Sequence, residues 1–212
     1  MPRIVDLTLT MRPGMRGVEF EPKSTFAGKG WNTTTLHIYS HAGTHLDAPH
    51  HFLAEGQAME ALSLEKCMGP AHVIDLSFIK ARDLITPEHL APFADSIGPG
   101  ARVLLKTGWS AHADSPDYRS HLPRISLALA EWLAEHRIAL LGVEPPSVAD
   151  PNNPQELIEV HRALLRAGIV IVEGLTNLDA LRRDEVTFIA LPLKLEGGDG
   201  SPVRAIAVEE DD

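Results

Sequence analysis

The chain has 212 residues, of which 44% are hydrophobic and 23% charged, and its net charge is −10 with histidine counted as neutral. This composition is ordinary for a soluble globular protein, and the length suits one medium domain or two small ones. The acidic balance and the absence of a basic run argue against nucleic acid or an anionic membrane as a partner.

Export and membrane insertion are not indicated either. A single cysteine, Cys67, cannot form an internal disulfide. The residues from Met1 to Asp6 lack the apolar core of a signal peptide, and no apolar run approaches the ~20 residues of a membrane span. We therefore expect a cytoplasmic protein from a bacterium or archaeon.

The first forty residues are predicted to contain two strands separated by a long loop. Ile4 to Leu9 alternates apolar and polar residues, as a strand does. Residues 11–30 are rich in glycine and proline and are predicted to be irregular. Trp31 to Tyr39 is rich in threonine and other β-branched residues, so it is the second predicted strand, and it leads directly to His41.

Four histidines and one aspartate fall within the eleven residues from His41 to His51. We do not expect a helix in this segment, because Gly43 weakens helices and Pro49 forces the preceding residue toward an extended conformation. We expect the end of a strand followed by a tight loop that directs several imidazoles to one point. Gly43 would allow the backbone to approach closely there.

The residue types in this segment suit a divalent cation. Neutral imidazole and carboxylate together bind zinc, manganese, iron or cobalt, and the segment contains no thiolate. A structural zinc site usually closes its coordination with four protein ligands, often cysteines. An open catalytic site, with water in the remaining position, matches these residues better.

Strands and helices alternate in the rest of the chain, which indicates a mixed α/β fold. Helices are predicted to begin at Thr86–Pro87, at Ser126 and at Pro154, where capping residues or a first-turn proline stand, and the last runs to about Ala167. We see no repeat or linker and predict one domain, residues 1–212. Strands are predicted at residues 71–76, 102–107, 138–143, 169–172, 187–193 and 202–208, a polar loop at 110–121, and a frayed acidic tail at 209–212.

A second candidate group lies late in the chain. Glu173 directly follows the continuous apolar run from Ile169 to Val172, which is typical of a fully buried strand. A carboxylate at the end of such a strand is costly unless it is paired or bound to a metal. His161 stands on the predicted helix before this strand. Taken alone, Glu173 could pair with an arginine and His161 could be a surface residue.

The pattern His-x-Gly-Thr-His-x-Asp-x-Pro-x-His over residues 41–51 resembles the signature of a known family. This is the cyclase family of metal-dependent hydrolases, which includes bacterial kynurenine formamidases and isatin hydrolases. The resemblance covers nearly the whole chain, including residues 200–205. It implies one or two divalent cations, Zn²⁺ or Mn²⁺, in each subunit. The implied ligands of these cations are His41, His45, Asp47, His161 and Glu173, with Asp47 bridging two metals.

The same resemblance implies further roles. His51, rather than its neighbour His50, is expected to be the catalytic histidine beside the metal. The loop of residues 11–30 corresponds to one that helps to close the substrate pocket, so Phe26 could bind substrate. Trp109 follows a strand at a place that lies near the substrate in the family. Both aromatic residues could instead be packing anchors.

Fold and activity are implied as well. The family fold is a mixed-sheet, β-barrel-like core with helices packed outside, of the swivelling β/β/α type. Its members form dimers or larger homo-oligomers, in which the N-terminal part contributes to a neighbour. The expected activity is hydrolysis of an amide bond, a formamide or a lactam, in a small aromatic substrate by metal-activated water. Alternatives are a lactonase or polyketide-type cyclase on the same site, or a metal-binding module without catalytic activity.

Overall fold

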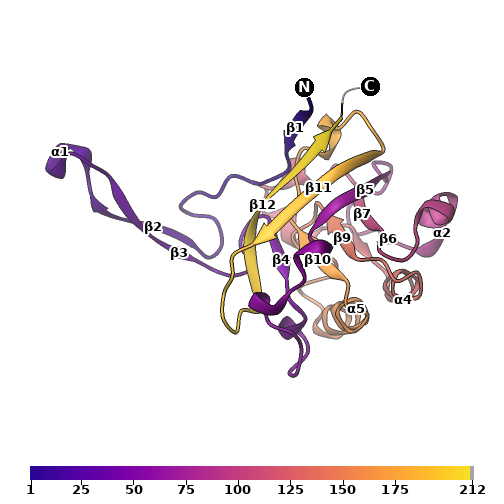
Figure 1. Ribbon diagram of the computed structural model, residues 1–212. Coiled ribbons are helices and arrows are strands. Elements are labelled where there is room, and N and C mark those ends of the chain that lie inside the picture. Colours follow the sequence, from indigo (N-terminus) through magenta and orange to yellow (C-terminus); the bar gives the residue numbers. More distant parts are fainter. Residues whose placement is uncertain (211–212) are drawn as a thin grey trace.

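The protein is described by a computed structural model in which residues 1–210 are placed. Seven strands form one mixed sheet that closes on itself, because β12 pairs with both β11 and β4 (Figure 1). An eighth strand, β1, adds to β12 outside this ring. In spatial order the ring consists of β12 (Gly200–Glu209), β11 (Glu185–Pro192), β5 (Met68–Asp75), β7 (Arg102–Lys106), β9 (Leu140–Val143), β10 (Val170–Glu173) and β4 (His45–Asp47), and β1 is Arg3–Asp6.

The two faces of the closed sheet belong to two different cores. Along β10, Val170 and Val172 point into the ring, whereas Ile171 points outward, as the two-residue period of a strand requires. Helices α4 (Leu127–Glu135) and α5 (Pro154–Arg166) cover the outer face of the parallel strands (Figure 1). The predicted fold, a barrel-like mixed sheet with helices outside, is confirmed.

The predicted helix starts are also confirmed. Ser126 accepts a hydrogen bond from the Leu129 amide at the beginning of α4. Asn153 caps α5 in the same way, with Pro154 in the first turn. Thr86 and His89 form a reciprocal cap on α2 (Pro87–Leu90), so His89 has a structural role. These contacts satisfy backbone donors that the first turn of a helix leaves free.

The N-terminal region departs from the sequence-based prediction. Residues 18–29, predicted to be part of a long loop, contain β2 (Val18–Ser24) and α1 (Phe26–Lys29). β2 pairs with β3 (Thr33–Ile38) in a two-stranded sheet that projects from the body as an arm (Figure 1). The prediction was wrong because Pro22 and the nearby glycines are typical of loops, whereas pairing with β3 determines the conformation of this segment. A bulge between Pro22 and Ser24 accommodates the proline.

Two further segments differ from expectation. The predicted polar loop 110–121 contains a 3₁₀ turn, η5 (Trp109–His112), and the short helix α3 (Asp117–Ser120). Glu209 was predicted to fray, but it ends β12 opposite Arg3, and its buried carboxylate accepts the Arg182 amide at 2.6 Å. Residues 211 and 212 lie outside the described part of the chain.

The remaining elements are short. β6 and β8 pair in parallel and form a small separate sheet. Within residues 1–210, no helix has both the length and the apolar character needed to cross a membrane. The short elements are β6 (Leu84–Ile85), β8 (Arg124–Ile125) and the 3₁₀ turns η1 (Pro49–His51), η2 (Met59–Ala61), η3 (Leu64–Lys66), η4 (Ala91–Ser96) and η6 (Leu178–Ala180).

Candidate metal centre and adjoining cavity

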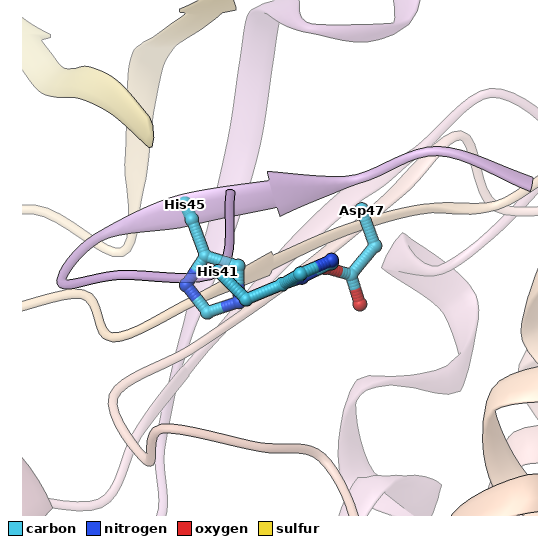
Figure 2. A group of neighbouring side chains, drawn as sticks. All are labelled: His41, His45 and Asp47. Carbon is cyan, nitrogen blue, oxygen red and sulfur yellow. The ribbon is translucent and has the colours of Figure 1, made fainter. Parts of the chain in front are cut away.

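The pairing of β4 with β10 brings the two candidate groups of the sequence together. These strands are antiparallel, and their register places His45 opposite Glu173. Leu46 points into the ring, so His45 and Asp47 share the opposite, outer face of β4. Figure 2 shows the side chains of both residues leaving β4 on the same side, beside the His41 imidazole. Sheet register therefore creates a group of polar side chains facing the outer layer of helices.

Helix α5 adds His161 to the polar side chains of His45, Asp47 and Glu173 on this face. Its buried side is apolar except for His161, which lies among Val160, Leu164 and Leu165. The His161 Nε2 atom lies 3.4 Å from Glu173 Oε1 and 3.8 Å from Asp47 Oδ2. His161 is therefore not the surface residue that its helix alone would allow, because it is 2% exposed.

The first group is equally compact. His41 Nδ1 lies 2.8 Å from Asp47 Oδ1, and His45 Nε2 lies 3.6 Å from the same oxygen. His45 Nε2 is also 3.3 Å from Glu173 Oε2. Three overlapping sets of candidate ligand atoms result, each within 4.8 Å, and Asp47 belongs to two of them: His41, His45 and Asp47, and Asp47, His161 and Glu173. The third set is His41, His51 and Asp199.

Backbone carbonyls orient two of the imidazoles. His45 Nδ1 lies 2.9 Å from the Gly43 carbonyl, and His161 Nδ1 lies 2.7 Å from the Leu157 carbonyl. A carbonyl only accepts, so each Nδ1 carries a proton and each Nε2 faces the centre of the cluster, where it donates to Glu173 when protonated and can bind a cation when it is not. Histidines that bind metals are commonly held in this manner.

One oxygen in the cluster has no hydrogen-bond partner. Asp47 is 1% exposed, and its Oδ2 is buried without a donor, the only such side-chain atom in the described chain. A buried carboxylate oxygen without a donor is costly. A cation would satisfy it, and the donor set of imidazoles and carboxylates suits a divalent transition metal. The residues present therefore fit a metal.

The carboxylates and imidazoles of the cluster shift one another's pKa values toward the charged forms. Burial by itself lowers the pKa of His45 and His161, but Glu173 and Asp47 more than offset it and hold both pKa values above the ordinary range. Burial raises the pKa of Glu173, yet hydrogen bonds to His161 and His45 hold it well below 4.5. The cluster thus favours an ionised Glu173, the form that binds a cation.

Two glycines allow the loop to approach so closely. A Cβ at Gly174 would lie 2.6 Å from the Gly43 carbonyl oxygen, and a Cβ at Gly200 would lie 2.6 Å from the His41 ring. Thr44 strengthens the first contact, because its hydroxyl donates to the Gly174 carbonyl at 2.5 Å. The predicted close approach at Gly43 is present, and Gly174 is the residue without a side chain that permits it.

His51 lies at the edge of the cluster. Its imidazole stacks on that of His41, with ring centroids 3.9 Å apart, whereas His50 is exposed. Burial, together with His41 and His161, lowers the pKa of His51. The sequence analysis did not single out Asp199, whose Oδ2 lies 3.3 Å from His41 Nε2 and 3.9 Å from His51 Nδ1. The glycines on either side of Asp199, just before β12, were the available signal.

A cavity of about 520 Å³ adjoins the cluster, and His41 and His45 form part of its lining. Neither predicted substrate-binding aromatic residue lines it. Trp109 is 7% exposed, packs with Tyr118 and Leu122, and donates its indole N–H to the Tyr118 carbonyl at 3.0 Å. Trp109 therefore packs within its own chain, which is the alternative that the sequence analysis gave for it.

Phe26 also lies apart from the cavity of its own chain. It stands at the tip of the arm and is 70% exposed. The segment of residues 9–16, which precedes the arm, lines the cavity instead. The arginines at the cavity, Arg12, Arg16 and Arg119, were not singled out by the sequence, because only the fold brings their segments together.

Known proteins resemble this chain over most of its length. A family described as "Putative cyclase" matches residues 5–150. The kynurenine formamidase of Bordetella petrii is 37% identical over 180 residues, covering 84% of this chain and 81% of that protein. The kynurenine formamidase of Bacillus thuringiensis (strain Al Hakam) is 37% identical over 175 residues, covering 82% and 79%.

Solved structures give the same result. Isatin hydrolase A from Labrenzia aggregata, bound to benzyl benzoate, superposes with a TM-score of 0.89 at 28% identity, covering 99% of this chain and 94% of that one. A structure described as a potential metal-dependent hydrolase with cyclase activity has a TM-score of 0.82 at 25% identity, with complete coverage of both chains. This chain belongs to the cyclase family of metal-dependent hydrolases.

Proposed function

We propose that this protein hydrolyses an amide bond, a formamide or a lactam, in a small aromatic substrate. The observation that carries the proposal is the buried cluster of imidazoles and carboxylates in which Asp47 Oδ2 has no donor, next to a cavity. The kynurenine formamidases and isatin hydrolases named above act on substrates of this kind, as their names state.

We propose that five side chains hold one or two divalent cations, Zn²⁺ or Mn²⁺. A cation bound there would polarise the substrate carbonyl and lower the pKa of water. Glu173 offers ionised oxygens, and His45 and His161 offer Nε2 lone pairs, because carbonyls fix their Nδ1 protons. The proposed ligands are His41, His45, Asp47, His161 and Glu173.

His51 is proposed to move the proton. Its lowered pKa leaves the imidazole neutral near pH 7, so it can accept a proton and then donate it to the departing nitrogen. The stack on His41 holds the ring beside the cluster. Asp199, 3.9 Å from His51 Nδ1, is placed to orient the ring and to stabilise its protonated form.

Substitution of adjacent histidines tests this role. His51→Ala should reduce turnover of formanilide, N-formylkynurenine or isatin by at least about 100-fold, the usual contribution of a general acid–base, with the metal content unchanged. His50→Ala is the matched control, because His50 is exposed, and it should retain activity. His45→Ala should lose metal by elemental analysis. Full activity of His51→Ala would remove that residue from the mechanism.

We also propose that the protein is a homodimer or a higher homo-oligomer. The arm has little core of its own, and large apolar side chains on it are exposed, including Phe26, Trp31 and Leu36. A neighbouring subunit that covered the arm would bury them, and Phe26 could then reach a site that it does not reach in its own chain. Light scattering after gel filtration tests this proposal, and a monomer at micromolar concentration would contradict it.

A further inference from the structure

The cavity beside the metal cluster is positively charged in an acidic protein. Its lining contains three arginines, Arg12, Arg16 and Arg119, and one carboxylate, Asp114, which leaves an excess of two positive charges. The whole chain carries −10. Arginines gathered in a cavity under these conditions indicate an anionic ligand, because like charges repel unless a counter-charge lies between them.

Only one of the three arginines is neutralised by the protein. Arg12 pairs with Asp114, which also lines the cavity. Arg16 lies over the Tyr39 ring, 4.9 Å from its centroid. Within residues 1–210, neither Arg16 nor Arg119 has a carboxylate within salt-bridge distance, and Arg119 also has no hydrogen-bond acceptor, although it is half-buried. Two guanidinium groups therefore remain available to a ligand.

The surroundings of Arg119 disfavour its charged form. Burial, followed by the charge of Arg16, lowers the pKa of Arg119. A guanidinium that has lost part of its water without gaining an acceptor is destabilising, and an anion would reverse that effect. The planar guanidinium group of Arg119 can donate two parallel hydrogen bonds to the two oxygens of a carboxylate, and such paired hydrogen bonds are among the stronger ones in proteins.

The rest of the cavity defines the other end of the ligand. His41 and His45, two of the proposed metal ligands, belong to the same lining as Arg119. Leu9, Met15 and Pro146 supply apolar wall between polar groups. A molecule that fills the cavity would place a reactive carbonyl at the histidines, an apolar ring along the wall and an anionic group at the arginines.

We propose that Arg119, assisted by Arg16, binds a carboxylate of the substrate, so that the preferred substrates are aromatic amides carrying a carboxylate group. This proposal rests on the proposed amide hydrolysis and specifies its substrate class. Arg119 is a specificity-determining residue in this account, since it contacts a part of the substrate that does not react.

Matched substrates test the proposal. Formanilide and the 2-, 3- and 4-formamidobenzoates differ only in the presence and position of a carboxylate. For the best isomer, the metal-loaded protein should show a kcat/KM at least about tenfold above that for formanilide, because buried polar groups reject an analogue that leaves them unpaired. Equal kcat/KM values for formanilide and all three isomers would overturn the proposal.

Arginine variants assign the effect to a residue. Arg119→Gln should raise KM for the best formamidobenzoate at least about tenfold, with little change for formanilide. Arg119→Lys should restore part of the loss. Arg12→Gln is the matched control, because Arg12 already has a carboxylate partner. An equal fall in kcat for both substrates in Arg119→Gln would assign that residue to the reacting centre or the fold and overturn a role in carboxylate binding.

A binding measurement separates this proposal from the proposed function. Calorimetry with the three aminobenzoates and with aniline needs no turnover. The native protein should bind one aminobenzoate more tightly than aniline, and Arg119→Gln should lose that preference with its metal content unchanged. If no formanilide is hydrolysed but the preference is present, amide hydrolysis fails and the arginine site stands. If hydrolysis occurs without the preference, the arginine site fails.

Discussion

Two neighbouring strands of the sheet end in a buried glutamate, and the two glutamates have different surroundings. β9 and β10 pair in parallel, and Glu144 follows the first as Glu173 ends the second. Glu144 is 1% exposed and Glu173 is 4% exposed, so burial does not distinguish them. The hydrogen-bond donors around each carboxylate do.

Glu144 is satisfied by its own polypeptide. Its Oε2 accepts from the Thr107 amide at 2.7 Å, from the Thr107 hydroxyl at 3.1 Å and from the Gly108 amide, and its Oε1 accepts from the Ser110 hydroxyl at 2.8 Å. Four hydrogen bonds fix the turn that follows β7. A carboxylate that accepts four hydrogen bonds from its own chain has little capacity left for a ligand, so we infer that its role is to stabilise the fold.

Among residues 1–210, Glu173 receives one backbone hydrogen bond, from Val148 at 2.8 Å. Its remaining neighbours are the imidazoles of His45 and His161, which can bind a metal through the same atoms that face Glu173. We infer that Glu173 differs from Glu144 because most of its donors are imidazoles that could bind a cation instead, whereas the donors to Glu144 are amides and hydroxyls that could not.

The largest effect is expected for Glu173→Gln on metal binding. Gln keeps the volume and can still accept from the Val148 amide, but it loses the charge that binds a cation. Metal affinity, measured by titration against a competing chelator, should fall at least about tenfold, equivalent to about 1.4 kcal/mol or more of binding free energy. Glu144→Gln is the control and should retain its metal. Equal metal loss in both variants would refute the distinction.

The second prediction concerns stability. Glu144→Ala removes the carboxylate that accepts from four donors, and the buried Thr107 amide and the partly buried Gly108 amide would lose their partner. The free energy of unfolding should fall by about 3 kcal/mol, because each unsatisfied buried donor costs about 1–3 kcal/mol. Urea denaturation of the metal-free protein measures this loss. A smaller loss than in Glu173→Ala would contradict the structural role of Glu144.

The sequence predicted Glu173 and missed Glu144 for a physical reason. Both follow an apolar run, so local pattern treats them alike. Glu173 was identified because it stands in a recognised family pattern with His161 and the histidine segment. The partners of Glu144 lie on the neighbouring strand and turn, 34 to 37 positions earlier in the chain, and no local period encodes that pairing.

The same limit explains the other outcomes. Strands with strong apolar runs and helices with capping residues were predicted, because short-range periodicity and capping determine them. The arm was missed, since the pairing of β2 with β3 overrides a segment rich in glycine and proline. Asp199 and Arg119 were missed because they approach the histidines only after the sheet closes.

The third prediction tests the contact between the end of β10 and the histidine loop. Gly174 has φ +68°, and a Cβ there would meet the Gly43 carbonyl oxygen at 2.6 Å. Gly174→Ala should therefore destabilise the fold by about 2 kcal/mol through its left-handed backbone alone, and should also weaken metal binding by displacing the loop. Gly197 has φ +66°, and a Cβ there would meet no atom within 4 Å, so Gly197→Ala is the matched control for backbone strain. Retention of native metal affinity in Gly174→Ala would show that the loop tolerates the displacement.

The smallest effect is a pH dependence that should differ with and without metal. In the metal-free protein the pKa of His161 is raised above 6.5, so its contribution to stability is complete below pH 6.5 and is lost as pH rises through the folded pKa. The pKa of Glu173 lies well below 4.5, so its contribution is present above pH 4.5 and is lost as pH falls through the folded pKa.

These two contributions together are greatest between pH 4.5 and 6.5. We therefore compare the Tm of the native protein with that of Glu173→Gln, both treated with a chelator. The Tm advantage of the native protein should decline by a few degrees from pH 6.5 to 8.5, about what 1 kcal/mol produces in a domain of this size. A bound metal reverses the sign, because protons compete with it for the same imidazoles and its affinity grows as pH rises. The Tm difference between metal-loaded and metal-free protein should widen across this range. If it narrowed, the imidazoles that face Glu173 would not be the groups that bind the metal.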